Sequence, residues 1–306
     1  MQRFASGLVL ALFLLLPAAG PSASTPAGRI AFTRFTEGTT RIAVVASTGR
    51  AAVDLVKRGP HGQGEPAWSP DGRWIAFNGR DRDGTQGLYV ARVSGRFLLR
   101  RLTRNEPTTE AGSTASSDVH PVWSPDGKWI MFQRFRPPES DLYLVRPSGG
   151  APRLFLRDGL TPAWSPDGRR IAFVRSAGNA NTDLWIVGAN RRGLRPLTTH
   201  PSRESEPDWS PDGKRIVFVR YNDGNFELWT IGSEGKSPSR LTRVASNEVN
   251  ATWSPDGTSI AFASDRSGGQ FDIYVMRTNG TRPRRLTTSG EHDIAPVWQP
   301  LVLSGG

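Results

Sequence analysis

Five copies of one short motif constrain the fold of this chain more than any other feature. Each copy reads Trp-Ser-Pro-Asp-Gly, and a Pro or an Ala stands two positions before the Trp. The copies form the last five residues of the segments 66–72, 121–127, 162–168, 207–213 and 251–257. A truncated sixth copy lies within 296–300. The Trp residues stand at positions 68, 123, 164, 209, 253 and 298, which gives spacings of 55, 41, 45, 44 and 45. A period of this size indicates an array of similar structural units.

Each unit continues with three more segments that have the composition of strands. A β-branched and aromatic stretch such as 74–77 or 260–262 follows the Pro-Asp-Gly turn, and an alternating stretch such as 88–90 or 228–230 comes next. The fourth segment ends near a Leu-Thr pair such as Leu102-Thr103. Four strands in a repeat of this length are typical of one blade of a β-propeller.

The two ends of the chain complete each other. Residues 30–32 and 42–45 match the second and third strands without a preceding motif, whereas Trp298 belongs to a first strand with nothing after it. We therefore expect an all-β, six-bladed propeller of four-stranded blades over residues 28–300. The C-terminal strand should join the N-terminal blade and close the ring, which leaves no long unpaired edge. Residues 301–306 are expected to be a short tail.

These repeats resemble a known family. The Trp-Ser-Pro-Asp-Gly, Ile-Ala-Phe, Ile-Tyr-Val and Arg-Leu-Thr series, together with Ser264-Asp-Arg-Ser-Gly268, is similar to the WD40-like (PD40) repeat of the TolB β-propeller family. The resemblance covers the segment 28–300 and implies a periplasmic platform for other proteins. The α/β domain that TolB carries ahead of its propeller has no counterpart in this sequence.

The first 25 residues have a different character from the rest. Arg3 precedes an apolar run over residues 8–19, and small residues follow, which is typical of a secretory signal peptide. We expect an exported protein that is periplasmic, bound to the cell envelope or extracellular, with no membrane span in its mature form. Because the chain has no Cys, disulfides cannot stabilise it.

The net positive charge of the chain favours an anionic partner, or it serves only to keep the protein soluble. The chain has 39 Lys and Arg against 28 Asp and Glu, a formal net charge of +11. An anionic envelope component or a protein would suit such a charge, and so would a role in keeping the protein soluble. The signal peptide argues against a nucleic-acid partner, and we expect a monomer.

Polar residues recur at fixed distances before each repeat Trp. Five positions before it stand Gln63, Asp118, Gly159, Glu204, Glu248 and Asp293, and three positions before it stand Glu65, His120, Thr161, Glu206, Asn250 and Ala295. If the strands are in register, these residues surround the mouth of the central channel. Candidate ligands for a divalent cation are Asp118, His120, Glu204, Glu248, His292 and Asp293. The alternative is a set of hydrated strand ends, since no calcium-loop spacing appears, and no cofactor is predicted.

Basic residues cluster near the ends of the second strands. Arg34, Arg134, Arg175 and Arg220 each lie two positions past the strand Phe, and Arg80 and Arg82 lie in the following hairpin. These six are candidate partner-binding residues, with solubility as the alternative. The stretch 105–119 is longer than its counterparts, and we expect it to contribute to partner recognition.

Catalytic signatures are missing from the sequence. It contains no Gly-x-Ser-x-Gly elbow, no phosphate-binding loop and no Cys nucleophile, and the repeat Trp and Asp residues are expected to serve as core and turn residues. We therefore predict a non-enzymatic binding platform that acts through its loops and has no catalytic residues. The alternative is a propeller enzyme, either a metal-dependent lactonase or a glycan hydrolase, with its site at the channel mouth.

Overall fold

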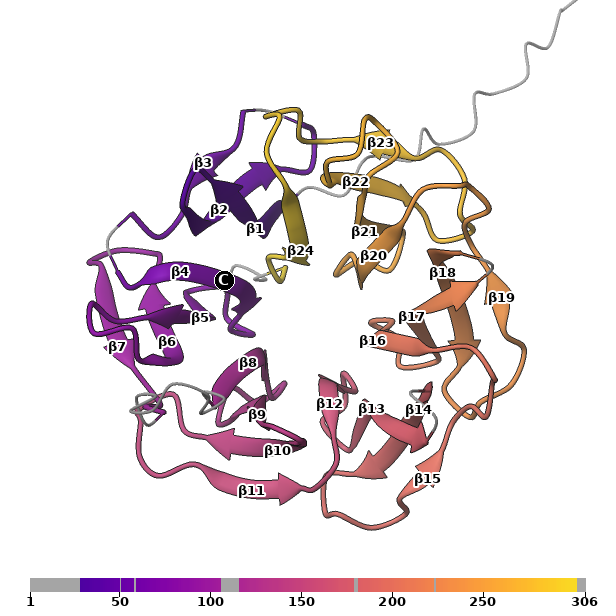
Figure 1. Cartoon of the computed structure of the whole chain (residues 1–306), viewed down its shortest axis with the longest axis horizontal. Coiled ribbons are helices and arrows are strands. Elements are labelled where there is room, and N and C mark those ends of the chain that lie inside the picture. Colours follow the sequence, from indigo (N-terminus) through magenta and orange to yellow (C-terminus); the bar gives the residue numbers. More distant parts are fainter. Residues whose placement is uncertain are drawn as a thin grey trace, which may run out of the picture.

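Six four-stranded antiparallel sheets form a ring around a central channel (Figure 1). The computed structural model describes residues 28–301 apart from 50, 58, 106–115, 179–180 and 223. The predicted signal peptide, most of the tail and most of the long 105–119 stretch therefore lie outside the described residues. The six-bladed all-β architecture predicted from the repeat is confirmed.

The blades are numbered here in chain order. Blade 1 contains β24 (Asp293–Trp298), β1 (Arg29–Thr36), β2 (Thr39–Ala46) and β3 (Val53–Asp54). Blade 2 contains β4 (His61–Trp68), β5 (Trp74–Arg80), β6 (Gln86–Arg92) and β7 (Leu98–Arg101). Blade 3 contains β8 (Ser117–Trp123), β9 (Ile130–Arg136), β10 (Glu139–Val145) and β11 (Arg153–Leu156).

The other three blades follow the same order. Blade 4 contains β12 (Leu160–Trp164), β13 (Arg170–Gly178), β14 (Asn181–Gly188) and β15 (Arg195–Pro196). Blade 5 contains β16 (Glu204–Trp209), β17 (Arg215–Asn222), β18 (Asn225–Gly232) and β19 (Ser239–Arg240). Blade 6 contains β20 (Glu248–Trp253), β21 (Ser259–Ser264), β22 (Asp272–Arg277) and β23 (Arg284–Arg285). Nowhere in the described ranges is there a helix that could cross a bilayer.

The repeated motif forms the turn between the first and second strands. In blade 2 the Ser69 hydroxyl donates to Asp71 (2.5 Å) and accepts from the backbone nitrogen of Trp74 (2.9 Å). Asp71 accepts from the backbone nitrogen of Arg73, and Gly72 has a φ of +64°, which Gly adopts without strain. The equivalent bonds recur at the motifs of blades 3 to 6. In these turns hydrogen bonds from the motif Ser lower the pKa of Asp126, Asp167 and Asp212.

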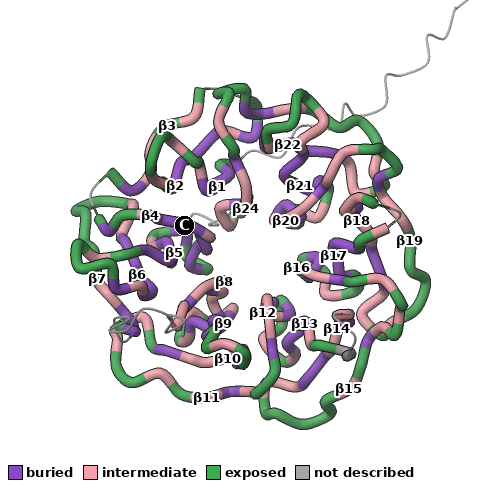
Figure 2. Tube along the Cα trace, in the orientation of Figure 1, coloured by how far each residue is buried: buried purple, intermediate pink, exposed green. Residues whose placement is uncertain are grey.

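The apolar core consists of layers between neighbouring blades. One cluster joins Ile42 of blade 1 to Trp68 and Phe77 of blade 2, and each later pair of neighbours shares a similar cluster. The last cluster packs Trp298 and Ile30 of blade 1 against Ala261 of blade 6. Buried residues accordingly follow the inner and middle strands in Figure 2, and exposed ones follow the rim. Each blade therefore depends on both of its neighbours.

The ring closes within blade 1. β24 pairs antiparallel with β1, with Trp298 opposite Ile30 and Asp293 opposite Arg34. The first strand of this blade therefore comes from the C-terminal end of the described chain and the other three from its N-terminal end. The predicted shared blade is confirmed.

The closure can be tested at Trp298, which is buried in the layer between blades 6 and 1. We expect Trp298→Ala to lower the free energy of unfolding by about 3–5 kcal/mol, the usual cost of removing a buried Trp. Urea denaturation monitored by circular dichroism measures the change. Phe97→Ala, at an exposed aromatic residue, serves as the control and should change stability by less than about 1 kcal/mol. Equal effects of the two variants would contradict the closure.

Candidate functional site

The two ends of the ring carry different connections. Because the strands of a blade alternate in direction, the links from second to third strand and from fourth to first strand meet at one end, which we call the loop face. The Ser-Pro-Asp-Gly turns and the links from third to fourth strand meet at the other end, which we call the turn face. The first strands surround the channel between these faces (Figure 1).

A β-bulge interrupts every first strand at the same position. The third residue before each repeat Trp has a positive φ between 41° and 54°, and the ladder with the second strand shifts register there. In five blades the next residue is a Pro, which has no N–H to donate to the ladder, so the pairing is broken at that point. The bulge residues are Glu65, His120, Thr161, Glu206, Asn250 and Ala295.

The bulges line a cavity of about 360 Å³ in the channel. All six bulge residues contribute to its wall, as do the residues that follow them, including Asp208 and Thr252. Glu65, Glu206 and Asp208 make the wall acidic, although the whole chain is strongly basic. These side chains are deep in the molecule but only partly buried, because they face the open channel.

The channel acids also connect neighbouring blades. Glu65 accepts from the backbone nitrogen of His120 in the next blade (2.6 Å), and Glu206 accepts from that of Asn250 (2.6 Å). Asn250 in turn accepts from the backbone nitrogen of Ala295 (3.2 Å). The N–H groups exposed by the bulges are thus satisfied by side chains of the preceding blade.

Burial changes the ionisation of two channel acids. It raises the pKa of Asp208 to about 6, and it raises the pKa of Glu206, to which the negative charge of Glu65 also contributes. The imidazole of His120 lies 3.4 Å from the Glu65 carboxylate. The channel therefore offers carboxylates that accept hydrogen bonds, and burial favours the neutral form of two of them, Glu206 and Asp208.

Two of the acids predicted to surround the channel mouth form ion pairs with Arg residues of the neighbouring strand. Asp118 lies directly opposite Arg134 in the antiparallel ladder, and Glu204 lies opposite Arg220. Both Asp118 carboxylate oxygens accept from Arg134, at 2.6 and 2.7 Å, and all of these four side chains are buried. Burial opposes the charge of Arg134, but the hydrogen bonds and charge of Asp118 raise its pKa. These residues form internal ion pairs beneath the loop face.

The same pairing occurs in two other blades. Asp293 accepts from Arg34 at 2.7 and 2.8 Å, and this hydrogen bonding raises the pKa of Arg34. In blade 6 Ser264 stands opposite Glu248, and Arg266 supplies the cation at 3.1 Å. The four acids proposed as cation ligands thus belong to four separate blades, each beside its own Arg. The described residues contain no group of three His, Asp or Glu side chains placed to hold a metal ion.

The remaining predicted residues have varied surroundings. Arg175, which has no acidic residue at the equivalent first-strand position, donates to the backbone oxygen of Arg157 and lies 3.6 Å from Asp158. Arg80 and Arg82 are exposed on the loop face. His120 lies in the channel, whereas His292 is exposed and packs edge-on against Phe35. Partner binding by Arg175, Arg80 and Arg82 stays a prediction, while Arg34, Arg134 and Arg220 are engaged internally.

Three exposed aromatic residues on the loop face were not predicted. Phe35, Phe135 and Tyr221 each lie three positions past the strand Phe, near the end of the second strand, and are 38–42% exposed. The alternation of each strand points them away from the core, and their shared position in the repeat was the signal that could have revealed them. Exposed aromatic and Arg side chains together are typical of protein-binding surfaces.

The family is established by comparison. A profile described as the TolB beta propeller domain matches residues 15–159 and 157–302. The chain belongs to the TolB β-propeller family. No curated protein sequence is significantly similar to it.

Solved structures show the same fold in proteins of several kinds. TolB from Acinetobacter baumannii is 21% identical, with a TM-score of 0.75 over 89% of this chain and 67% of that one. A putative TolB from Agrobacterium tumefaciens is 23% identical, with a TM-score of 0.64 over 86% and 90%. An oligogalacturonate lyase in complex with manganese is 15% identical, with a TM-score of 0.52 over 86% and 74%. The fold alone does not decide between binding and catalysis.

The internal ion pairs give a stability prediction. We expect Glu204→Ala to destabilise the protein by about 3–5 kcal/mol, because it leaves the Arg220 guanidinium buried without a counter-charge. Combining Glu204→Leu with Arg220→Met removes both charges and should restore most of the loss. Urea denaturation of the single and double variants measures the difference. If the double variant were as unstable as the single one, the ion pair would not be the cause.

The channel acids give a pH prediction. Asp208 has a raised pKa in the folded state, so its ionisation costs stability as the pH rises from about 4 to 6. Asp208→Asn should therefore raise the melting temperature at pH 7.5 and have little effect near pH 4. Asp212→Asn in the same blade is the control, because the lowered pKa of Asp212 predicts a loss of stability at pH 7.5. Thermal unfolding at both pH values provides the test, and a pH-independent effect of Asp208→Asn would contradict it.

Proposed function

We propose that this protein is an exported, non-enzymatic binding platform that receives a protein partner on its loop face. The observation that carries the proposal is the set of exposed aromatics Phe35, Phe135 and Tyr221, which recur around an acid-lined channel. Three blades present the same kind of contact group at the same height, as a single large ligand would require. The signal-like N-terminal segment supports export.

The charges of the loop face define the chemistry of the partner. Arg80, Arg82 and Arg175 offer guanidinium groups at the hairpins, and the channel offers the carboxylates of Glu65 and Glu206. A partner that inserts a basic side chain or an ammonium group into the channel would meet hydrogen-bond acceptors there. Its surrounding surface would meet aromatic and basic groups. This pattern fits a folded protein with a protruding basic segment better than a uniform polyanion.

The family resemblance supports the same proposal. Two of the similar structures are a TolB protein and a putative TolB protein, and the family match extends over the whole propeller. Internal use of the predicted metal ligands Asp118, Glu204 and Asp293 removes the main support for a metal-dependent enzyme at the loop face. The proposal therefore assigns binding, with no reaction step, to this surface.

The test is a crosslinking pull-down of the tagged protein from the cell envelope of its source. We expect one protein to be recovered reproducibly, and we expect the triple variant Phe35→Ser, Phe135→Ser, Tyr221→Ser to reduce its recovery at least about tenfold. Leu194→Ser is the control, because Leu194 is equally exposed but lies on a link between third and fourth strands, at the turn face. Unchanged recovery by the triple variant would contradict the proposal.

A further inference from the structure

An apolar triplet is exposed at the turn face of blade 2. All seven residues from Ser94 to Arg100, which link β6 to β7 and begin β7, are exposed. Phe97, Leu98 and Leu99 lie in this segment with 40–44% of their surface accessible. Figure 1 shows β7 at the outer rim of the ring, where no further strand covers it. Three consecutive large apolar side chains in solvent are unfavourable unless something covers them.

The propeller fold does not require this triplet. The corresponding positions are Lys236-Ser237-Pro238-Ser239 in blade 5 and Thr281-Arg282-Pro283-Arg284 in blade 6, which are polar or Pro. The interval from Leu88 to Leu102 is 14 positions, one more than the 13 between the equivalent residues of blades 5 and 6. Leu102 itself is buried, so the core is complete without the triplet. The inserted residue and the apolar side chains therefore serve something outside the blade.

The triplet is embedded in positive charge. Residues 88–105 contain five Arg and no Asp or Glu, and two of these, Arg101 and Arg104, form ion pairs with Asp81 and Asp83. Arg96 and Arg100 flank the apolar residues directly and are exposed. Arg100 donates to the backbone oxygen of Pro147 (3.0 Å), which holds the guanidinium in place without neutralising it.

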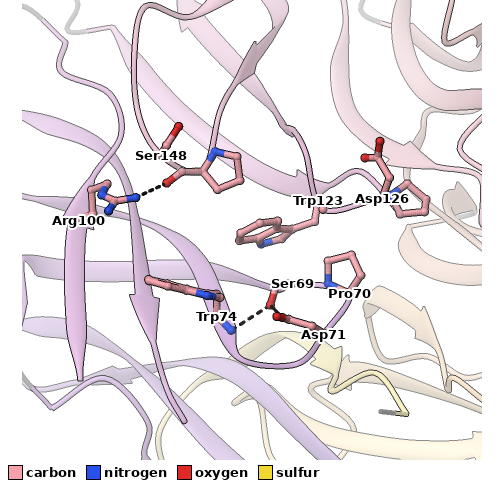
Figure 3. Close-up of a pocket in the computed structure, with 11 residues that line it drawn as sticks. Ser69, Pro70, Asp71, Trp74, Arg100, Trp123, Asp126 and Ser148 are labelled. Atoms are coloured by element: carbon pink, nitrogen blue, oxygen red, sulfur yellow. Dashed lines mark hydrogen bonds between the residues drawn. The ribbon is translucent and has the colours of Figure 1, made fainter. Parts of the chain in front are cut away.

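Aromatic groups extend the patch toward blade 3. A pocket of about 430 Å³ lies between the two blades, and Figure 3 shows Trp74, Trp123 and Arg100 around it. Asp71 and Asp126 also line this pocket, and both accept hydrogen bonds within their own turns. Beyond it, the guanidinium of Arg146 lies 4.1 Å from the ring centre of Trp129. The turn face of blades 2 and 3 thus combines aliphatic, indole and guanidinium groups.

We infer that the turn face of blades 2 and 3 docks on an anionic phospholipid bilayer. Phe97, Leu98 and Leu99 enter the boundary between headgroups and acyl chains, and Arg96 and Arg100 contact lipid phosphates. Apolar side chains flanked by cations are what an anionic membrane surface binds, since burial of hydrocarbon and charge attraction add. A soluble polyanion would use the Arg residues but gives the triplet no contact. The inference is independent of the proposed function, because docking by the turn face leaves the loop face open.

The experiment is co-sedimentation with vesicles. The chain is started at Pro26, which keeps all 24 strands and removes the apolar N-terminal segment as a competing anchor. We expect binding to vesicles of equimolar phosphatidylcholine and phosphatidylglycerol, and at least about tenfold weaker binding to phosphatidylcholine alone. The variant Phe97→Ser, Leu98→Ser, Leu99→Ser should bind the anionic vesicles at least about tenfold more weakly. Arg96→Gln with Arg100→Gln should weaken binding about tenfold and reduce its salt dependence.

Matched controls separate this inference from its alternatives. The loop-face variant Phe35→Ser, Phe135→Ser, Tyr221→Ser replaces the same number of exposed residues, but on the opposite face. It should bind vesicles as strongly as the unaltered chain. Absence of binding to anionic vesicles, or equal binding by the apolar triple variant, would overturn the inference. So would binding to a soluble anionic glycan at the strength seen with vesicles. Self-association that the apolar triple variant abolishes, without vesicle binding, would assign the patch to a second copy instead.

A site-specific probe tests insertion directly. Because the chain has no Cys, Leu98→Cys can be labelled with a polarity-sensitive fluorophore at a single position. Its emission should shift to the blue on anionic vesicles, whereas the same label at Leu194→Cys should not respond. Equal responses at the two positions would show that the bilayer does not contact the triplet selectively.

Discussion

The packing of each blade on its two neighbours is the interaction on which the rest of the structure depends. No blade has a core of its own, because the apolar clusters lie between blades and not within them. The repeat Trp residues supply much of this layer, and two of them also bond across it. Trp123 donates to the backbone oxygen of Ala67 (3.1 Å) and Trp209 to that of Ala163 (3.2 Å). The layer between blades 6 and 1 is filled in the same way, so the pairing of β24 with β1 adds one more stabilising interface to the ring.

The sequence predicted the features that depend on period and on local turn chemistry. The spacing of the Trp residues predicted the length of a blade and the count of repeated strands predicted the number of blades, while the unmatched first strand at Trp298 predicted the closure. The role of the motif Asp residues followed from the way Asp accepts backbone hydrogen bonds in turns. Each of these inferences needs only residues that are close in the sequence or repeated along it, and no knowledge of how two strands are aligned.

The ion pairs were missed because they depend on strand register. Asp118 was found by counting back from a Trp on the first strand, and Arg134 by counting forward from a Phe on the second. Only the antiparallel ladder, with its bulge, shows that these positions are directly opposite. Three of the acids and three of the Arg residues that were assigned to separate roles therefore form ion pairs with one another. The spacing of 16 positions between acid and Arg in blades 3 and 5 was the sequence signal, and the 259-position separation in blade 1 shows why it is easily overlooked.

The bulge residues show how structure and binding chemistry share the same side chains. A non-Gly residue with positive φ is strained, and its N–H is turned away from the ladder. In blades 1 and 3 the polar residue after the strand Phe, Thr33 or Gln133, accepts from the bulge N–H of the next blade. In blades 2 and 5 the bulge side chain of the same blade does so, because Glu65 accepts from His120 and Glu206 accepts from Asn250. These two channel acids thus also complete the hydrogen bonding of the bulges.

This structural role accounts for two of the acids in the channel of a basic protein. Glu206 is held in place by one backbone donor, and burial raises its pKa, so its charge is incompletely compensated by the protein. A ligand that brings a hydrogen-bond donor or a cation into the cavity would relieve that cost, whereas an anion would increase it. The basic hairpins of the loop face, by contrast, favour an anionic group. Selectivity on the loop face therefore arises from the difference in charge between the basic hairpins and the acidic channel. A ligand of uniform charge, whether positive or negative, is attracted to only one of them.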